Sequence, residues 1–195
     1  MGLYGAKESM NNKAVFLDRD GTINKDKHYL YKVSEFEYLE GVIGGLKKLY
    51  DYGFILVIIT NQSGIARGYY SEADYYSLDA WMKKDLNDKG IEIKASYFCP
   101  HLPNGIVPRY STECGCRKPK TELFWKAAKD LNIDMNRSYA VGDKLRDLCI
   151  CEESGVKGIL LSDDSYNDSK YTVCPDWDGI VNYIIKNEED MKIDQ

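Results

Sequence analysis

Two carboxylates, Asp18 and Asp20, stand directly after the apolar run Ala14–Leu17. A short apolar run that stops at acids predicts a buried strand that delivers them to the edge of a sheet. Residues two apart point to the same side of an extended chain, so the two acids repel each other and require a cation, a shared proton or separate roles. A divalent metal ion would offset the repulsion between the two carboxylates and attract phosphate. A solvated acidic turn is the competing interpretation, because Asp20-Gly21 is a common turn signal.

Phosphoryl transfer gives each acid a distinct role. The Asp18 carboxylate could take a phosphoryl group as an aspartyl phosphate, which splits one slow displacement into two faster ones. Asp20 would protonate the leaving oxygen and later deprotonate the attacking water. Asp18 is therefore the candidate nucleophile and Asp20 the candidate acid/base.

Polar residues also follow three further predicted strands. Thr60–Ser63 follow Phe54–Ile59, Cys99 and His101 follow Ile91–Phe98, and Asp143 and Lys144 follow Ser138–Val141. Ligands of open parallel sheets bind outside the carboxyl ends of the strands, so this convergence predicts a site at that edge. Asp143 is the preferred third carboxylate for a Mg²⁺ site with Asp18 and the Asp20 backbone carbonyl. Asp147 is interpreted as a first-turn acid that favours a helix dipole.

Phosphate also requires fixed cations and hydrogen-bond donors. Arg117-Lys118-Pro119-Lys120 is by itself typical of a solvated face, but beside two acids Lys118 becomes the point charge that offsets them. Arg117 could hold a hydroxyl or a second oxyanion of the substrate. Thr60 and Asn61 offer a hydroxyl, an amide and backbone N–H groups, although Asn and Ser at this place are also turn formers.

The pairs Cys99-x-His101 and Cys114-x-Cys116 predict a metal centre of another kind. Three thiolates and one imidazole make a closed tetrahedral zinc site with no position for water, so the zinc would be structural. It would clip the loop between the two pairs, which has little core of its own. A chance cluster or a redox pair is the alternative. Cys149, Cys151 and Cys174 are interpreted as small apolar residues.

The strands alternate with amphipathic stretches, which predicts an α/β fold: a Rossmann-like, doubly wound parallel sheet with helices on both faces. Helices are expected over Gly41–Tyr52, from the cap Ser71 to near Gly90, and over Thr121–Leu131, with further strands at Gly158–Leu161 and Thr172–Cys174. We predict a flexible leader at 1–13, a single domain at 14–186 and a charged tail at 187–195.

Composition excludes several classes of protein. The chain has 195 residues and a net charge of -5, so it has no overall basic field for nucleic acid. It has no stretch near the ~20 apolar residues of a membrane span. Its first residues lack the apolar centre of a secretory signal, which favours the cytoplasm. No nucleic-acid or membrane partner is expected.

Together these residues resemble the haloacid dehalogenase superfamily of Mg²⁺-dependent phosphatases. Within it, the closest similarity is to the D-glycero-D-manno-heptose 1,7-bisphosphate 7-phosphatases, from about Ala14 to Leu161. The segments that carry the resemblance are Phe16–Asn24 (FLDRDGTIN), Thr60–Gly68 (TNQSGIARG), Cys99–His101 (CPH), Cys114–Lys120 (CGCRKPK) and Val141–Lys144 (VGDK).

The resemblance implies a role for each matching residue. Asp18 is nucleophile and Mg²⁺ ligand, Asp20 is acid/base and Mg²⁺ ligand, and Asp143 completes the Mg²⁺ site. The zinc ligands are Cys99, His101, Cys114 and Cys116, and the substrate contacts are Asp26, Lys27, His28, Tyr29, Thr60, Asn61, Gln62, Ser63, Arg117, Lys118 and Lys144. It also implies a minimal cap, a monomer and a small sugar bisphosphate as substrate. Thr121-Glu122 replaces the usual Gly-Met after Arg-Lys-Pro, at no catalytic position.

Three other functions compete. Histidinol-phosphate phosphatase has similar aspartates and a similar zinc loop, but Arg117 suits a bisphosphorylated sugar better than a cationic aminoalcohol. The Cys/His loop and the basic run would suit a zinc-stabilised nucleic-acid-binding module, which the net charge opposes. A catalytically silent sugar-phosphate sensor would lack one of the four residues Asp18, Asp20, Lys118 and Asp143, and all are present.

Overall fold

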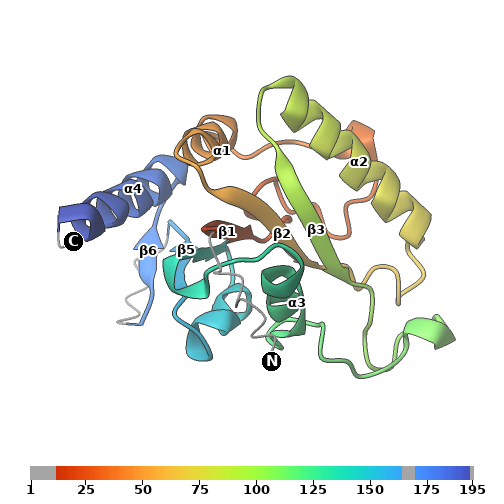
Figure 1. Cartoon of the computed structure of the whole chain (residues 1–195). Helices are drawn as coiled ribbons and strands as arrows, with labels where there is room; N and C mark the ends of the chain where they lie inside the picture. Colours follow the sequence, from red (N-terminus) through yellow and green to blue (C-terminus); the bar gives the residue numbers. More distant parts are fainter. Residues whose placement is uncertain (1–11, 164–169, 194–195) are drawn as a thin grey trace, which may run out of the picture.

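The computed structural model describes residues 12–163 and 170–193. Its six strands form one parallel sheet in the order β3-β2-β1-β4-β5-β6 (Figure 1). The doubly wound fold predicted from the alternating pattern is confirmed. The elements in chain order are β1 (Ala14–Leu17), η1 (Val33–Glu35), α1 (Val42–Asp51), β2 (Ile55–Asn61), α2 (Glu72–Asp88), β3 (Ile93–Cys99), η2 (Pro108–Tyr110), α3 (Glu122–Asp130), η3 (Met135–Arg137), β4 (Tyr139–Gly142), η4 (Leu145–Glu152), β5 (Lys157–Leu161), β6 (Thr172–Cys174) and α4 (Trp177–Ile193).

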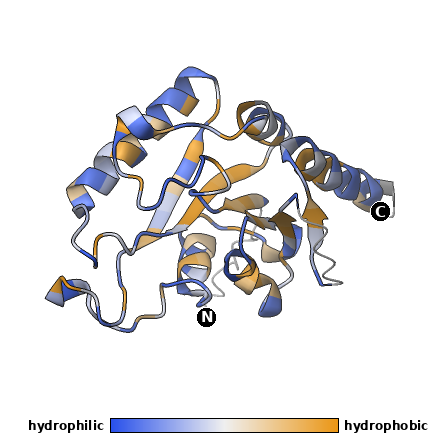
Figure 2. Ribbon diagram, turned by 180° about the vertical axis from the view of Figure 1, so that it is seen from behind, coloured by the Kyte–Doolittle hydropathy of each residue, from blue (hydrophilic) through white to orange (hydrophobic). Residues whose placement is uncertain are grey.

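Helices cover both faces of the sheet. Val15 and Leu17 of β1 pack in the core with residues of α1, α2 and α4, whereas Ala14 and Phe16 pack on the other face with α3 and η4. Figure 2 shows the hydrophobic central strands between helices that are polar on their outer sides. Because β1 is covered on both sides, all four of its residues are apolar, and the polar chemistry begins where the strand ends.

The segment boundaries differ from the predictions where tertiary pairing extends an element. β2 continues through Thr60 and Asn61, which pair with Phe98 and Cys99 of β3. The helix start at Ser71 is confirmed, with a capping box to Asp74.

The two ends of the predicted domain are also tied to the sheet. Of the leader, residues 1–11 lie outside the described residues, and Asn12 forms a bridge with Ile133. Residues 187–193 of the predicted charged tail belong to α4, which continues to Ile193. Glu188, only 3% exposed, forms a 2.9 Å ion pair with Lys13, which fixes this part of the helix against the start of β1.

Loops surround the carboxyl ends of the strands. The segment from 18 to 41, between β1 and α1, holds η1 and two isolated bridges through Asn24, to Asp20 and to Tyr38. This small insert is the cap-like element next to the site. No helix among the described residues has both the length and the apolar character needed to cross a membrane.

Candidate active site

Asp18 lies at the end of β1, with its backbone N–H donating to the Val141 carbonyl of β4 at 3.0 Å. Its carboxylate is buried and accepts a hydrogen bond from the Lys118 ammonium at 2.6 Å. Burial raises the pKa of Asp18 to about 7, Lys118 opposes this shift, and Asp147 adds to it. Asp18 is therefore an acid whose ionisation depends on the cations around it.

Lys118 is the fixed cation of the site and is 2% exposed. Its ammonium also contacts Asp147 at 2.8 Å and donates to the Ile59 carbonyl at 2.6 Å. Asn61 fixes the backbone of Lys118 with two 3.0 Å hydrogen bonds. Burial by itself would lower the pKa of Lys118, but Asp18 and Asp147 leave it above its ordinary value. The ammonium therefore stays charged between two carboxylates.

Three carboxylates converge beside Lys118. One oxygen each of Asp18, Asp143 and Asp147 lie within 4.8 Å of one another. Asp147 also accepts from the Lys144 backbone N–H at 3.0 Å, so it caps η4 and joins the cluster at once. Hard oxygen donors that converge in this way fit a Mg²⁺ ion.

Gly21 is required for the approach of the β1 loop to this acid cluster. Its φ is +92°, and a Cβ atom there would lie 2.5 Å from an Asp143 carboxylate oxygen. Only glycine combines this conformation with the close contact.

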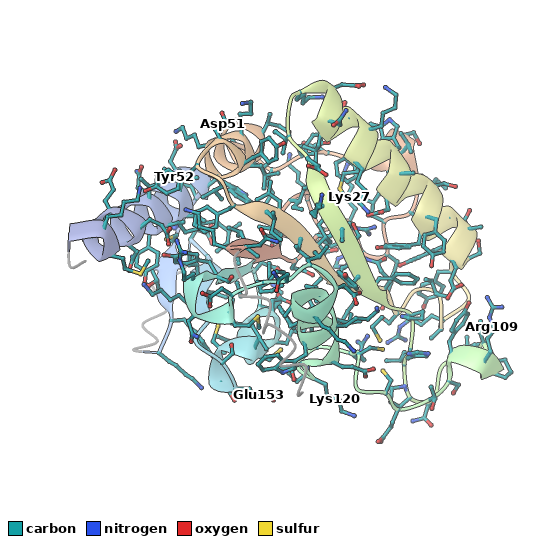
Figure 3. All side chains as sticks on the ribbon, in the orientation of Figure 1. Lys27, Asp51, Tyr52, Arg109, Lys120 and Glu153 are labelled. Carbon is teal, nitrogen blue, oxygen red and sulfur yellow. The ribbon has the colours of Figure 1, made fainter. Side chains whose placement is uncertain are left out.

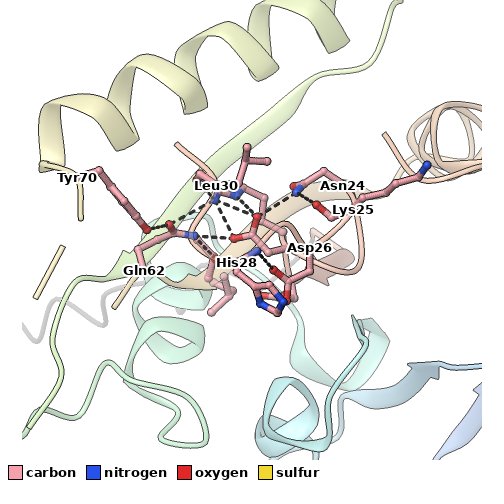
Figure 4. Close-up of polar contacts among 12 residues, drawn as sticks. Asn24, Lys25, Asp26, His28, Leu30, Gln62 and Tyr70 are labelled. Atoms are coloured by element: carbon pink, nitrogen blue, oxygen red, sulfur yellow. Dashed lines mark hydrogen bonds and ion pairs between the residues drawn. The ribbon is translucent and has the colours of Figure 1, made fainter. Parts of the chain in front are cut away.

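Asp20 lies outside the acid cluster in a cradle of donors, which include Asn24 and Gln62, both labelled in Figure 4. Arg19, buried at 1% exposure, donates to both carboxylate oxygens at 2.8 and 3.0 Å. Asn24 and Gln62 each donate one hydrogen bond of 3.0 Å. Burial alone would lower the pKa of Arg19, but Asp20 leaves it raised. The two acids of the first loop therefore occupy different electrostatic surroundings, as their predicted roles require.

A cavity of about 260 Å³ opens over these acids. Most residues that the sequence singled out for the substrate lie on its wall, together with the two catalytic candidates Asp18 and Asp20. The substrate residues on the wall are Asp26, His28, Tyr29, Thr60, Asn61, Gln62, Ser63 and Arg117. Lys118 lies behind Asp18.

The remaining predicted substrate residues have other partners. Lys27 forms a 3.2 Å ion pair with Glu37, and Lys144 forms a 2.8 Å ion pair with Asp143. Lys120 lies at the periphery of the molecule (Figure 3), which separates it from its buried neighbour Lys118.

The structure adds residues that sequence reasoning missed. Arg67, Tyr70 and Arg146 also line the cavity. Arg19 and Asn24 hold Asp20, although they lay inside the segment that was already singled out. Arg67 lies in the glycine-containing loop after β2, and its positive charge was a signal that the sequence offered. Arg146 and Tyr70 offered no such signal, because their place on the wall depends on how η4 and the loop before α2 fold back.

The two Cys/His pairs meet at the end of β3. The four donor atoms of Cys99, His101, Cys114 and Cys116 lie within 4.8 Å of one another, with Sγ–Sγ distances of 3.2 and 3.5 Å and Nδ1–Sγ distances of 3.3 and 3.8 Å. Ligands of a tetrahedral zinc are spaced about 3.3–3.8 Å apart, given bonds of about 2.0–2.3 Å. Burial raises the pKa of Cys99 to about 11, so thiolates here require a cation. The cluster fits zinc.

A doubly wound parallel sheet with a lysine-bound aspartate after its first strand, and two further acids after β4, defines a haloacid dehalogenase-like phosphatase. A family model described as polynucleotide kinase 3 phosphatase matches residues 13–172. The chain belongs to this phosphatase family and is a phosphoric monoester hydrolase.

Two curated relatives narrow the family. A D-glycero-beta-D-manno-heptose-1,7-bisphosphate 7-phosphatase of Haemophilus ducreyi is 52% identical over 78% of this chain and 84% of its own length. A D-glycero-alpha-D-manno-heptose-1,7-bisphosphate 7-phosphatase of Photorhabdus laumondii is 46% identical over 82% of this chain and 87% of its own length.

Solved structures of similar fold are also phosphatases of this class. A HAD-like phosphatase of Mesorhizobium loti superimposes with a TM-score of 0.80 at 28% identity, covering 89% of this chain and 85% of its own. The D,D-heptose 1,7-bisphosphate phosphatase of B. bronchiseptica, complexed with magnesium and phosphate, has a TM-score of 0.76 at 28% identity and covers 90% and 99%. The predicted membership of the haloacid dehalogenase superfamily is confirmed.

Proposed function

We propose that this protein removes the C7 phosphate of D-glycero-D-manno-heptose 1,7-bisphosphate with Mg²⁺, in the biosynthesis of nucleotide-activated heptose. The observation that carries the proposal is the Asp18 carboxylate held 2.6 Å from the buried Lys118 ammonium at the floor of a cavity lined by three arginines. The names of the curated relatives support the choice of sugar.

The first chemical step belongs to Asp18. One carboxylate oxygen attacks phosphorus, the bond from phosphorus to the sugar oxygen breaks, and an aspartyl phosphate forms. Lys118 remains beside the reacting group and offsets its negative charge, while Thr60 and Asn61 offer donors to the phosphoryl oxygens. Lys118 also keeps part of Asp18 ionised against the effect of burial.

Asp20 moves the protons. It gives a proton to the departing sugar oxygen, then takes one from the water that attacks the aspartyl phosphate. The second attack releases inorganic phosphate, frees the Asp18 carboxylate and returns Asp20 to its protonated form. Its separation from the acid cluster leaves Asp20 free for this work.

Asp18, Asp143, Asp147 and the Asp20 carbonyl would hold the Mg²⁺ ion. This assigns to Asp147 a ligand role that the sequence gave only to Asp143, because its carboxylate lies in the same cluster. Bound Mg²⁺ neutralises phosphate charge and orients the phosphoryl group.

The second phosphate of the substrate explains the arginines of the cavity wall. Among the described residues, Arg67, Arg117 and Arg146 form no ion pair, and the Arg67 Nε is buried without a hydrogen-bond partner. One dianion is met by Lys118 and the metal, so unpaired guanidinium groups on the wall favour a substrate with a second anionic group.

The test is phosphate release from a panel: both anomers of the heptose bisphosphate, histidinol phosphate and a DNA 3′-phosphate. We expect the heptose bisphosphate to have the highest kcat/KM, and ³¹P NMR to show a product that retains the anomeric phosphate. Preference for histidinol phosphate or DNA, or first release of the anomeric phosphate, would contradict the proposal.

Replacing Arg117 with Ala should lower kcat/KM for the bisphosphate by about 10- to 100-fold, the worth of one charge-assisted contact of ~1.5–3 kcal/mol. A sugar monophosphate should lose much less, since it has no second phosphate for this guanidinium. Arg109→Ala in the same loop, exposed at the periphery (Figure 3), is the matched control. Equal losses on both substrates would count against the assigned orientation.

We further propose a structural zinc at Cys99, His101, Cys114 and Cys116. Elemental analysis should find about one zinc per chain, and Cys116→Ser should lose it, because a closed site needs all four ligands. Cys151→Ser, outside the cluster, should retain the metal. A zinc-free protein with full folding stability and activity would refute the assignment. Reduced thiols fit the cytoplasm, where we place the protein.

A further inference from the structure

We propose that Gln62 and Tyr70 are positioning residues that fix the Asp20 carboxylate for proton transfer to the leaving group. From the sequence, Gln62 is predicted to contact substrate, and Tyr70 lines the same cavity. The inference rests on the proposed function only in taking Asp20 as the proton donor; it holds for any alkyl phosphate that the enzyme hydrolyses.

The side-chain amide of Gln62 is fully used inside the protein. It is 2% exposed, and its nitrogen donates to Asp20 at 3.0 Å and to the Thr60 hydroxyl at 2.9 Å. Its oxygen accepts from the Tyr70 hydroxyl at 2.5 Å. An amide nitrogen has two hydrogens, and both are engaged, so rotating the amide by 180° would place its oxygen against the Asp20 carboxylate. Tyr70 therefore selects the orientation in which Gln62 donates to Asp20.

Arg19 also contacts Asp20 and Gln62, and so belongs to the same hydrogen-bonded unit. One of its terminal nitrogens contacts both Asp20 oxygens and also donates to the Gln62 oxygen at 3.3 Å and to the Leu30 carbonyl at 3.1 Å. These contacts draw the Asp20 carboxylate away from the acid cluster around Asp18. Without them, a carboxylate two residues from Asp18 would be free to turn toward any cation there.

Tyr70 ties this unit to the loop that faces the substrate. Its ring stacks on Tyr31 with centroids 5.3 Å apart and planes 14° from parallel. Tyr31 follows Leu30, whose carbonyl accepts from Arg19, and Figure 4 shows Tyr70, Gln62 and Leu30 around the same network. Loops after β1 and β2 thus meet on the groups that orient Asp20.

Substrates with different leaving groups distinguish a positioning role of Gln62 and Tyr70 from any other role. When the phosphorus–oxygen bond to an alkyl group breaks, the Asp20 proton passes to that oxygen as Asp18 bonds to phosphorus. A nitrophenolate leaves without a proton. A misaligned Asp20 therefore slows the phosphorylation of Asp18 by alkyl phosphates and spares that by p-nitrophenyl phosphate, whereas a damaged fold or metal site slows both. The later attack of water needs Asp20 whatever the substrate was, so the comparison uses the release of the leaving group in a single turnover.

The experiment compares Gln62→Leu, Tyr70→Phe and the control Tyr75→Phe on p-nitrophenyl phosphate and on the alkyl phosphate that the wild-type enzyme hydrolyses fastest. Tyr75 belongs to the same buried aromatic cluster as Tyr70, but its hydroxyl has no hydrogen-bond partner among the described residues. We expect Gln62→Leu to lower the single-turnover rate of alcohol release from the alkyl phosphate about 10- to 100-fold, with the half-saturating substrate concentration within about threefold, as for a misplaced general acid. Tyr70→Phe should act in the same direction by a smaller factor, and Tyr75→Phe should match wild type.

Release of nitrophenolate from p-nitrophenyl phosphate in a single turnover, within about threefold of the wild-type rate, shows that a variant is folded. If Gln62→Leu does not fold, Tyr70→Phe carries the test, because it removes one hydroxyl and keeps the ring. Equal losses of the single-turnover release rate on both substrates overturn the proposal, as does a rise of the half-saturating substrate concentration alone, which would make Gln62 a substrate ligand. Failure of the heptose assignment would appear separately, as the absence of turnover of that sugar by the wild-type enzyme.

Discussion

Asp18→Asn is expected to lower turnover by at least about 10⁴-fold, because an amide cannot take the phosphoryl group while its size and shape remain. Single-turnover assays should show no burst of phosphate release. Acid quenching should trap a phosphorylated chain with wild type and none with the variant.

The fold of this variant should persist. Burial already disfavours the charged form of Asp18 and raises its pKa to about 7, so a neutral amide in the same place removes repulsion with Asp147 as well as attraction to Lys118. Thermal unfolding in EDTA should therefore remain close to wild type. Intact mass must exclude deamidation back to Asp. Appreciable single-turnover activity in a preparation free of deamidation would contradict the assignment of Asp18 as the nucleophile.

Lys118→Met is expected to lower kcat by about 10²- to 10³-fold, the usual loss when one preorganised group that stabilises transition-state charge is removed. Because Lys118 opposes the rise in the Asp18 pKa, its removal raises that pKa further. The acid limb of the kcat/KM profile should move to higher pH, relative to wild type at the same Mg²⁺ concentration.

The same substitution should also destabilise the protein. It leaves two buried carboxylates, Asp18 and Asp147, without their cation, and breaking a buried pair in this way costs roughly 3–5 kcal/mol. Lys120→Met is the matched control: it lies two residues away, is exposed, and should change neither activity nor unfolding. A Lys118 variant with the wild-type pH profile would remove Lys118 from the mechanism.

The sequence alone determined the fold class and the main chemical groups. Ala14–Leu17 is apolar throughout because both faces of β1 are covered, and that pattern is visible without coordinates. The Ser71 cap is likewise a local signal, satisfied within three residues by Asp74. The motif residues around Asp18, Lys118 and the two Cys/His pairs were recognisable because short segments carry them.

Only the tertiary structure decided how these groups divide the work. The sequence indicated that Asp147 is a first-turn acid favouring a helix dipole, and it does lie in the first turn of η4, but the pairing of β1 with β4 also brings it beside Asp18 and Lys118. Arg19, flanked by two acids in sequence, turned out to be the buried partner of Asp20 alone. Lys118 and Lys120 are alike in sequence, yet only Lys118 is buried and paired with Asp18 behind the cavity.

The physical reason is the range of the interactions. Apolar period, capping and motif spacing act over a few residues and can be read along the chain. Contacts such as that of Lys118 with Asp18, across 100 positions, depend on strand register, on which loop folds back and on the charges already buried there. The sequence supplied the candidate nucleophile, the cation and the candidate metal ligands; the packing of the sheet decided which acids share the cation and which one is held apart from them.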